Sequence, residues 1–140
     1  MRDDVEFCVG RPGRYDRPEW APIEQVLPER LFERFMWMNT VELHDGTELH
    51  AYKHGDSRRY LLLDTDGAAY EDLDRDRFRR MRLADALEQA FGVWWIVYWA
   101  TAEERELVRQ ALDAAAKADE ASGRDVLPPS SPASPFRRLP

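Results

Sequence analysis

Apolar and polar residues alternate along the middle of the chain, and two turn signals interrupt the alternation. Each signal is an Asp-Gly pair between apolar runs, first at His44-Asp45-Gly46 and then at Thr65-Asp66-Gly67. Asp-Gly between alternating apolar runs is typical of a tight β-hairpin. The pattern therefore predicts an antiparallel β-meander at the centre of the fold.

The register of the first hairpin follows from the face that it can bury. A two-residue loop at Asp45-Gly46 would pair Val41 with His50. A three-residue loop, with Gly46 in the left-handed conformation, pairs Val41 with Leu49 instead. The second register separates an apolar face (Val41, Leu43, Leu49, Ala51) from a polar face (Thr40, Glu42, Glu48, His50). Because a buried face specifies register strongly, we predict the three-residue loop.

Four further strands are predicted from shorter patterns. Val5–Val9 alternates and predicts an N-terminal strand, with the single cysteine, Cys8, as a small half-buried side chain. A turn at 55–57 leads to Arg58–Leu63, whose last residues are apolar on both faces, as in a central strand; Ala68–Glu71 follows as a short strand. Val93–Trp99 is apolar at every position and rich in β-branched and aromatic residues, which favours a buried strand.

Helical spacing predicts two main helices and one short one. Apolar residues recur at helical spacing from residue 74 to 91, with Asp74 as a candidate N-cap and Gly92 as a candidate C-cap. Thr101-Ala102-Glu103-Glu104 is a capping box that begins a helix to about Ala121. Pro28–Phe35 predicts the short helix, and the prolines and glycines of residues 10–28 predict a loop before it.

These elements predict an α+β fold in which an antiparallel β-meander carries two main helices packed on one face. Residues 1–121 are expected to form a single compact domain. Residues 122–140 hold five of the nine prolines beside four serines, so we expect a disordered tail there.

The net charge of the chain limits the classes of partner that it can be expected to bind. The formal net charge is −7, and the tail holds three basic residues and one acidic residue, so residues 1–121 carry −9. A field of this sign disfavours non-specific nucleic-acid binding and favours a basic protein partner. No run of 18 apolar residues occurs and the N-terminus lacks the apolar core of a signal peptide, so we expect no membrane association and a cytoplasmic location.

Aromatic residues are the first candidates for a binding surface. The run from Trp94 to Trp99 is expected to pack in the core, but an exposed face of Trp37, Trp94 or Tyr98 would mark a site of protein contact. In the tail, Phe136, Arg137 and Arg138 fit a short docking peptide on a flexible tether, and a frayed end without a role fits them equally well.

Arginines supply an alternative, nucleic-acid-binding site. In the predicted helix from residue 74, Arg75, Arg79 and Arg82 share one face, and Arg58 and Arg59 begin the predicted strand Arg58–Leu63. Such a face can contact phosphates. Acidic residues at i,i+3 and i,i+4 spacing are interleaved with it, however, so a charge-paired, solvated face is the simpler interpretation.

A third candidate, for a catalytic site, is the segment Leu61–Gly67. It ends in the sequence Asp64-Thr65-Asp66-Gly67. A strand ending in Asp-x-Asp-Gly resembles the first motif of haloacid-dehalogenase-type phosphatases. The resemblance implies Asp64 as a nucleophile, Asp66 as an acid/base, and magnesium bound by both. The chain departs from the family pattern at Ala68, where threonine is expected, and no lysine follows before Lys117. A plain hairpin turn explains the same residues.

The three histidines, His44, His50 and His54, fall in one hairpin. Residues four apart on a strand are separated by about 13 Å, which is too far for shared metal ligation. We therefore expect ordinary surface histidines, with His44 and His54 at turns and His50 on the polar face.

No catalytic, cofactor-binding or metal-binding motif stands out from the sequence. We therefore predict a non-catalytic, acidic protein-binding module, in the class of small bacterial or phage regulators and antagonists such as immunity and anti-defence proteins. The alternatives are a nucleic-acid-associated regulator that uses the arginine face, and a metal-dependent hydrolase at Asp64 and Asp66. No cofactor is predicted.

Overall fold

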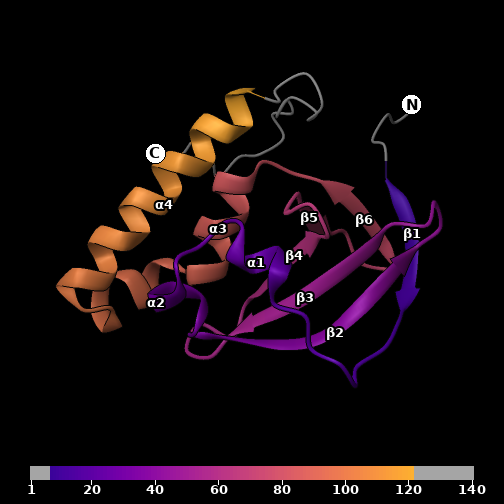
Figure 1. Cartoon of the computed structure of the whole chain (residues 1–140), viewed down its shortest axis with the longest axis horizontal. Helices are drawn as coiled ribbons and strands as arrows, with labels where there is room; N and C mark the ends of the chain where they lie inside the picture. The colour runs from indigo at the N-terminus through magenta and orange to yellow at the C-terminus, as the bar shows by residue number, and fades with distance from the viewer. Residues whose placement is uncertain (1–6, 122–140) are drawn as a thin grey trace.

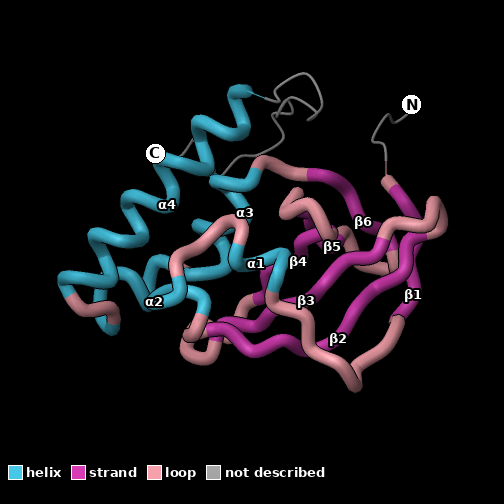
Figure 2. Tube along the Cα trace, in the orientation of Figure 1, coloured by secondary structure: helices cyan, strands magenta, loops and turns pink. Residues whose placement is uncertain are grey.

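The computed structural model describes residues 7–121, and the predicted tail, with Phe136, Arg137 and Arg138, lies outside the described residues. This part of the chain contains six strands, with two short helices between the first and second strands and the remaining helices after the sixth (Figures 1 and 2). The strands are β1 (Cys8–Pro12), β2 (Phe35–Leu43), β3 (Glu48–His54), β4 (Tyr60–Asp64), β5 (Ala69–Asp72) and β6 (Arg77–Arg80). The helices are α1 (Ala21–Glu24), α2 (Glu29–Phe32), α3 (Leu83–Phe91), the π-helix η1 (Trp95–Trp99) and α4 (Ala102–Ala121).

The strands form a closed antiparallel barrel in the order β1-β2-β3-β4-β5-β6. Each strand pairs with the next, and β6 returns to β1, where Cys8 lies opposite Phe78. Closure removes the two free edges that an open meander would expose. The predicted mixed α+β class is confirmed, whereas the predicted meander with two main helices on one face is confirmed only in part.

The first hairpin adopts the predicted register. Val41 lies opposite Leu49, and the backbone N–H of Leu43 donates to the carbonyl of Thr47 at 2.8 Å. Gly46 has a φ of 94°, the left-handed conformation that the three-residue loop requires. The apolar face from which the register was predicted therefore also specifies the register in the fold.

Apolar side chains gather in two clusters, one on each side of the barrel wall. The barrel interior holds Leu43, Leu49, Ala51, Leu62 and Phe78. The outer cluster lies between the wall and the helices and includes Leu31, Phe35, Tyr52, Leu61, Leu63, Leu87, Phe91 and Trp95. Because β3 and β4 are covered on both faces, their alternate residues are buried on either side.

The helices form two layers outside the barrel. Helices α1 and α3 pack on the outer face of β4, and α4 packs on α3 and α2 rather than on the sheet (Figure 1). The predicted capping box begins α4, which buries Val108, Ala111 and Ala115. Within residues 7–121, no helix is long and apolar enough to cross a membrane.

The predicted helix from Asp74 to Phe91 is wrong in its first half. Residues 74–76 have left-handed φ values of 60–76° and form the turn between β5 and β6, and the helix begins only at Leu83. Phe78 fitted the helical spacing, but on β6 it points into the barrel interior. Strand pairing with β5 and β1 therefore overrides the local helical pattern.

Smaller corrections concern the N-terminal third. Strand β1 extends to Pro12, into the predicted loop, and the same loop contains α1. The predicted short helix ends at Phe32, because Phe35 already opens β2 and pairs with His54.

Candidate functional site

The segment Val93–Trp99, which joins α3 to α4, is the aromatic segment. It is not the predicted buried strand but a helical turn followed by the π-helix η1. Five of its large side chains, Val93, Trp94, Val97, Tyr98 and Trp99, are between 52% and 71% exposed. Soluble proteins seldom expose so many adjacent large apolar side chains, and such patches mark binding surfaces.

The aromatic segment is anchored by Trp95, which is only 2% exposed. Its ring stacks on Phe91, with centroids 5.5 Å apart, and meets His54 edge-on at 4.7 Å. The backbone N–H of Ala100 donates to the carbonyl of Trp95 at 2.8 Å, the i+5 bond of a π-helix. Gly92, with a φ of 80°, ends α3 as predicted and redirects the chain into the segment.

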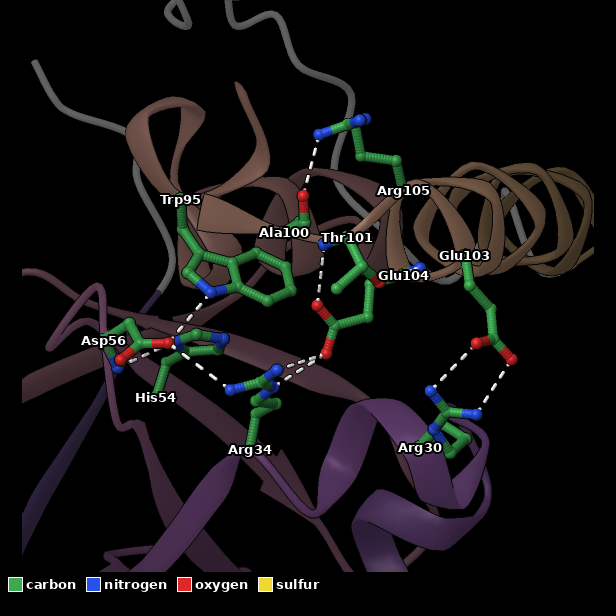
Figure 3. Close-up of polar contacts among 10 residues, drawn as sticks. All are labelled: Arg30, Arg34, His54, Asp56, Trp95, Ala100, Thr101, Glu103, Glu104 and Arg105. Carbon is green, nitrogen blue, oxygen red and sulfur yellow. Dashed lines mark hydrogen bonds and ion pairs between the residues drawn. The ribbon is translucent and has the colours of Figure 1, made fainter. Parts of the chain in front are cut away.

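A polar network beneath Trp95 ties the segment to the turn after β3 (Figure 3). The indole Nε1–H of Trp95 donates to Asp56 Oδ2 at 2.9 Å. Arg34 lies 3.7 Å from the same carboxylate and donates two hydrogen bonds to Glu104 Oε2, at 2.8 and 2.5 Å. Three segments distant in sequence are thus joined under the aromatic residues.

Glu104 connects this network to the start of α4. Its carboxylate accepts the backbone N–H of Thr101 at 2.9 Å, and the Thr101 hydroxyl accepts the backbone N–H of Glu104 at 3.0 Å, which confirms the predicted capping box. Burial raises the pKa of Glu104, but the hydrogen bonds from Thr101 and Arg34 outweigh it and lower the pKa below its usual value. The side chain is therefore a buried carboxylate in its charged form.

His54 is fully buried, so the prediction of a surface histidine is wrong. Its Nδ1 accepts the backbone N–H groups of Asp56 and Ser57, each at 3.1 Å, and Phe35, Phe91 and Trp95 surround the ring. Burial lowers the pKa of His54 to about 4. The imidazole is therefore neutral at pH 7, and its role is to order the turn that holds Trp95.

His50 is also fully buried, although it was expected on a polar surface. The loop after β1 covers this side of the hairpin: the backbone N–H of Arg14 donates to the Thr40 hydroxyl, and both Thr40 and His50 have no exposed surface. His50 Nδ1 accepts the indole N–H of Trp37 at 3.2 Å. Burial lowers the pKa of His50 against the opposing effect of Glu48.

The structure separates the predicted aromatic candidates. Trp94 and Tyr98 lie together on the aromatic segment, with ring centroids 4.5 Å apart. Trp37 is half-buried on β2, and its ring contacts His50 and Arg14 rather than either of them. The candidate surface therefore contains Trp94 and Tyr98 from the prediction, and excludes Trp37.

The predicted arginine face does not exist as a helix face. Arg75 lies in the β5–β6 turn, Arg79 on β6 and Arg82 just before α3. Arg79 forms an ion pair with Glu71 on the neighbouring strand. Arg58, with a φ of 66°, lies in the turn before β4 and Arg59 follows it.

Asp64 and Asp66 form a hairpin turn. Asp64 Oδ1 accepts the backbone N–H groups of Asp66 and Ala68, both at 2.9 Å, so this oxygen orders the turn. Within residues 7–121, no group of three His, Cys, Asp or Glu side chains is placed to hold a metal ion. The local structure is that of the plain hairpin considered for these residues.

A cavity of about 500 Å³ lies beside the aromatic segment. Trp94, Trp95 and Trp99 form one wall, and the polar lining comes from Asp56, Ser57, Arg59, Glu88 and Gln89. Ser57 also donates to the carbonyl of Ala90 at 2.6 Å, which holds the turn against the end of α3. The site thus combines exposed indole rings with a recess whose lining includes both acidic and basic side chains.

Several residues of the site were not foreseen. No local pattern predicts the contacts of Arg34, and the pattern around Asp56 predicts only a turn. A usable signal was present: Gly92 ends one helix and Thr101 begins the next, which leaves Ala100 as the one connecting residue beside a strand at 93–99.

Comparison with protein-family models, with curated proteins and with solved structures found no match for this chain in any of the three.

Proposed function

We propose that this protein is a non-catalytic, acidic protein-binding module that binds a basic protein partner through the aromatic segment. The proposal rests on one observation above all: Val93, Trp94, Val97, Tyr98 and Trp99 are exposed together, while Trp95 between them is buried. Tryptophan and tyrosine are the residues that most often dominate the energy of protein interfaces.

The attachment of the aromatic segment supports the same proposal. Asp56, Arg34 and Glu104 hold the inner side of the segment through Trp95 and the capping box. A surface that is ordered before binding loses less conformational entropy when it binds. The segment is therefore a preformed contact surface and not a loose connection between two helices.

The charge of the chain supports a basic partner. The net charge of −7 attracts a positively charged protein and repels nucleic acid at long range. We accordingly place the protein among small regulators or antagonists of basic proteins, of the bacterial or phage type.

The proposal is tested by affinity capture from a nuclease-treated lysate of the source cell, followed by binding measurements with the purified captured protein. The baits are the full chain, the double variant Trp94→Ala/Trp99→Ala, and Tyr15→Ala. Tyr15 is a matched control because it is 79% exposed but lies outside the aromatic segment. We expect one basic protein to bind the full chain and Tyr15→Ala at equal stoichiometry.

The double variant should lose this protein, because two large interface side chains of this kind contribute at least about 2 kcal/mol each in typical hot spots. Retention of the partner by the double variant would contradict the proposal. Size-exclusion chromatography with light scattering adds a second readout, because a dimer that dissociates in the double variant would show that the surface pairs with another copy of this chain instead.

A further inference from the structure

Exposed apolar side chains are concentrated in the aromatic segment. Ten large apolar side chains are exposed within residues 7–121, and five of them are Val93, Trp94, Val97, Tyr98 and Trp99. The other five are scattered over β1, β2, β4 and the residues that flank β1. Because adjacent exposed apolar side chains are unfavourable in water, an occupant that covers them stabilises the protein.

The cavity beside these rings adds an unpaired negative charge. Glu88 lies on its wall together with Trp94 and Trp99. Within residues 7–121, the Glu88 side chain makes no hydrogen bond or ion pair. Asp56 and Glu88 are the acidic residues of the described lining and Arg59 is its basic residue, so the lining has an excess of negative charge. Indole faces beside such a carboxylate attract a guanidinium or ammonium group.

A segment of the same chain has the matching residue types. The sequence Phe136-Arg137-Arg138-Leu139 sets two arginines between two apolar residues, and it lies outside the described residues. Residues 122–140 hold three basic residues and one acidic residue, whereas residues 1–121 carry a net charge of −9. The two parts of the chain therefore attract each other at long range.

The segment is long enough in its connection to reach the aromatic residues. Helix α4 begins at Ala102, just after Trp99, and its 20 residues extend over about 30 Å. The 15 residues from Ser122 to Phe136 can span about 50 Å when extended, which exceeds the length of the helix. A peptide on a tether of this length acts at an effective concentration on the order of 1 mM, so weak binding is sufficient for contact.

We propose that the chain's own segment Phe136–Leu139 binds the aromatic segment and the adjoining cavity in the free protein, and that it competes there with the basic protein partner. Phe136 packs against the rings of Trp94 and Trp99, and one of the two arginines enters the cavity beside Glu88. This inference rests on the proposed function and adds the regulation of the same surface.

Each contact in this arrangement follows from the chemistry of the surface. An aromatic ring that packs on exposed indoles buries apolar area and adds the attraction of an aromatic pair. A guanidinium between an indole face and a carboxylate gains both a cation–π and an ionic contact. The side chain of Arg59, which makes no hydrogen bond or ion pair within residues 7–121, can donate to a backbone carbonyl of the bound segment.

Competition follows because both ligands need the same surface. The partner binds only the fraction of molecules from which the segment has dissociated, so its apparent dissociation constant rises in inverse proportion to that fraction. A segment that is bound about four-fifths of the time weakens partner binding about fivefold. Removing the side chains of the segment should therefore strengthen partner binding.

The test compares NMR spectra of the isotopically labelled full chain with those of the triple variant Phe136→Ala/Arg137→Ala/Arg138→Ala. We expect the indole N–H signals of Trp94 and Trp99 to differ between the two proteins, because the rings lose the contact with the segment. Unchanged indole signals in the triple variant would overturn the proposal.

Two pairs of variants separate a specific contact from a general effect of charge. Arg124→Ala removes a positive charge of the tail outside the segment and should leave both indole signals at their parent positions. Glu88→Gln should move these signals toward those of the triple variant, whereas Glu24→Gln, at an exposed glutamate on α1, should not. Equal shifts for Arg124→Ala and the triple variant would overturn the segment as the occupant. Equal shifts for the two glutamine variants would overturn Glu88 as its ionic partner.

Dilution distinguishes a contact within one chain from a contact between two copies. A contact within the chain does not depend on protein concentration, because the tether sets the effective concentration of the segment. We therefore expect the indole difference between the parent and the triple variant to persist on dilution. A difference that disappears on dilution would place the segment on another copy and overturn the contact within the chain.

Calorimetric titration with the captured partner measures the competition. The triple variant should bind the partner about threefold to tenfold more tightly than the parent, and Arg124→Ala should bind it like the parent. Equal affinities of the triple variant and the parent would overturn the competition.

Failure of this inference is distinguishable from failure of the proposed function. If the indole signals do not respond to the segment while capture of the partner still depends on Trp94 and Trp99, this inference fails and the proposed function stands. If the indole signals respond while capture is independent of Trp94 and Trp99, the proposed function fails and the contact within the chain stands.

Discussion

The two sides of the aromatic segment have the same kinds of residue and opposite environments. Trp95 is 2% exposed and Trp99, one turn later, is 71% exposed. On the inner side, Trp95 contacts His54, Phe91 and Asp56. On the outer side, the contact between Trp94 and Tyr98 is the one ring–ring contact within the segment.

The difference shows how seven consecutive apolar residues can serve two purposes. The inner side contributes free energy of folding because its side chains leave water when the chain folds. The outer side contributes little to folding and retains its apolar area for a partner. The comparison therefore predicts large effects on stability for inner substitutions and small ones for outer substitutions.

The largest expected effect is that of Trp95→Ala, which removes the anchor of the segment. The lost burial and the resulting cavity should reduce the free energy of unfolding by about 3–5 kcal/mol. Urea denaturation followed by far-UV circular dichroism measures this change. Trp99→Ala is the matched control and should stay within about 0.5 kcal/mol of the parent. Equal losses for the two variants would contradict the division into two sides.

The second effect is a dependence of stability on pH that His54 produces. The pKa of this imidazole is about 4 in the folded protein, because burial disfavours its charged form, and about 6.5 in the unfolded chain. Above pH 6.5 both states are neutral, and between pH 6.5 and 4 only the unfolded state binds the proton. The free energy of unfolding should therefore fall over this window, by about 3 kcal/mol from this residue.

Urea denaturation at several pH values between 7 and 4 checks this prediction. His54→Gln should flatten the dependence, whatever its effect at pH 7. His50 contributes in the same direction, because burial lowers its pKa as well. A parent protein whose stability is constant from pH 7 to 4 would be inconsistent with two neutral buried histidines.

A smaller effect is expected for Glu104→Ala, at the point where the inner network meets α4. The change removes the cap on Thr101 and the partner of Arg34, and should cost about 1–2 kcal/mol. Glu103→Ala is the control, because Glu103 forms an exposed ion pair with Arg30 that contributes at most about 1 kcal/mol. Thermal melting should rank Glu104→Ala clearly below Glu103→Ala, and the reverse order would argue against the network.

The smallest expected effect concerns the outer side itself. A double-mutant cycle of Trp94→Ala and Tyr98→Ala should give a coupling of about 0.5–1.5 kcal/mol, the range of a packed aromatic pair. The four free energies of unfolding come from urea titrations. A coupling near zero would mean that the outer rings do not pack on each other in the free protein.

Local signals predicted those parts of the fold that local energy decides. The hairpin at residues 41–49 needed only an Asp-Gly turn and one apolar face, and its register is as predicted. The capping box at Thr101 and Glu104 satisfies backbone groups within four residues, and it also forms as predicted. Exposure of Trp94 or Tyr98 was foreseen as a mark of a binding surface, although their segment was assigned to a strand.

Tertiary contacts decided the rest. Phe78 fits the apolar spacing of the predicted helix, but barrel closure places residues 77–80 on a strand between β5 and β1. The polar residue His50 is buried because the loop after β1 covers it, which no pattern within the hairpin reveals.

The amino-acid sequence by itself determined the turns, the caps and the mixed fold class, because these depend on neighbours in the chain. Only the tertiary structure decided which of seven apolar residues face solvent, because that depends on Asp56, Arg34 and His54 from distant segments.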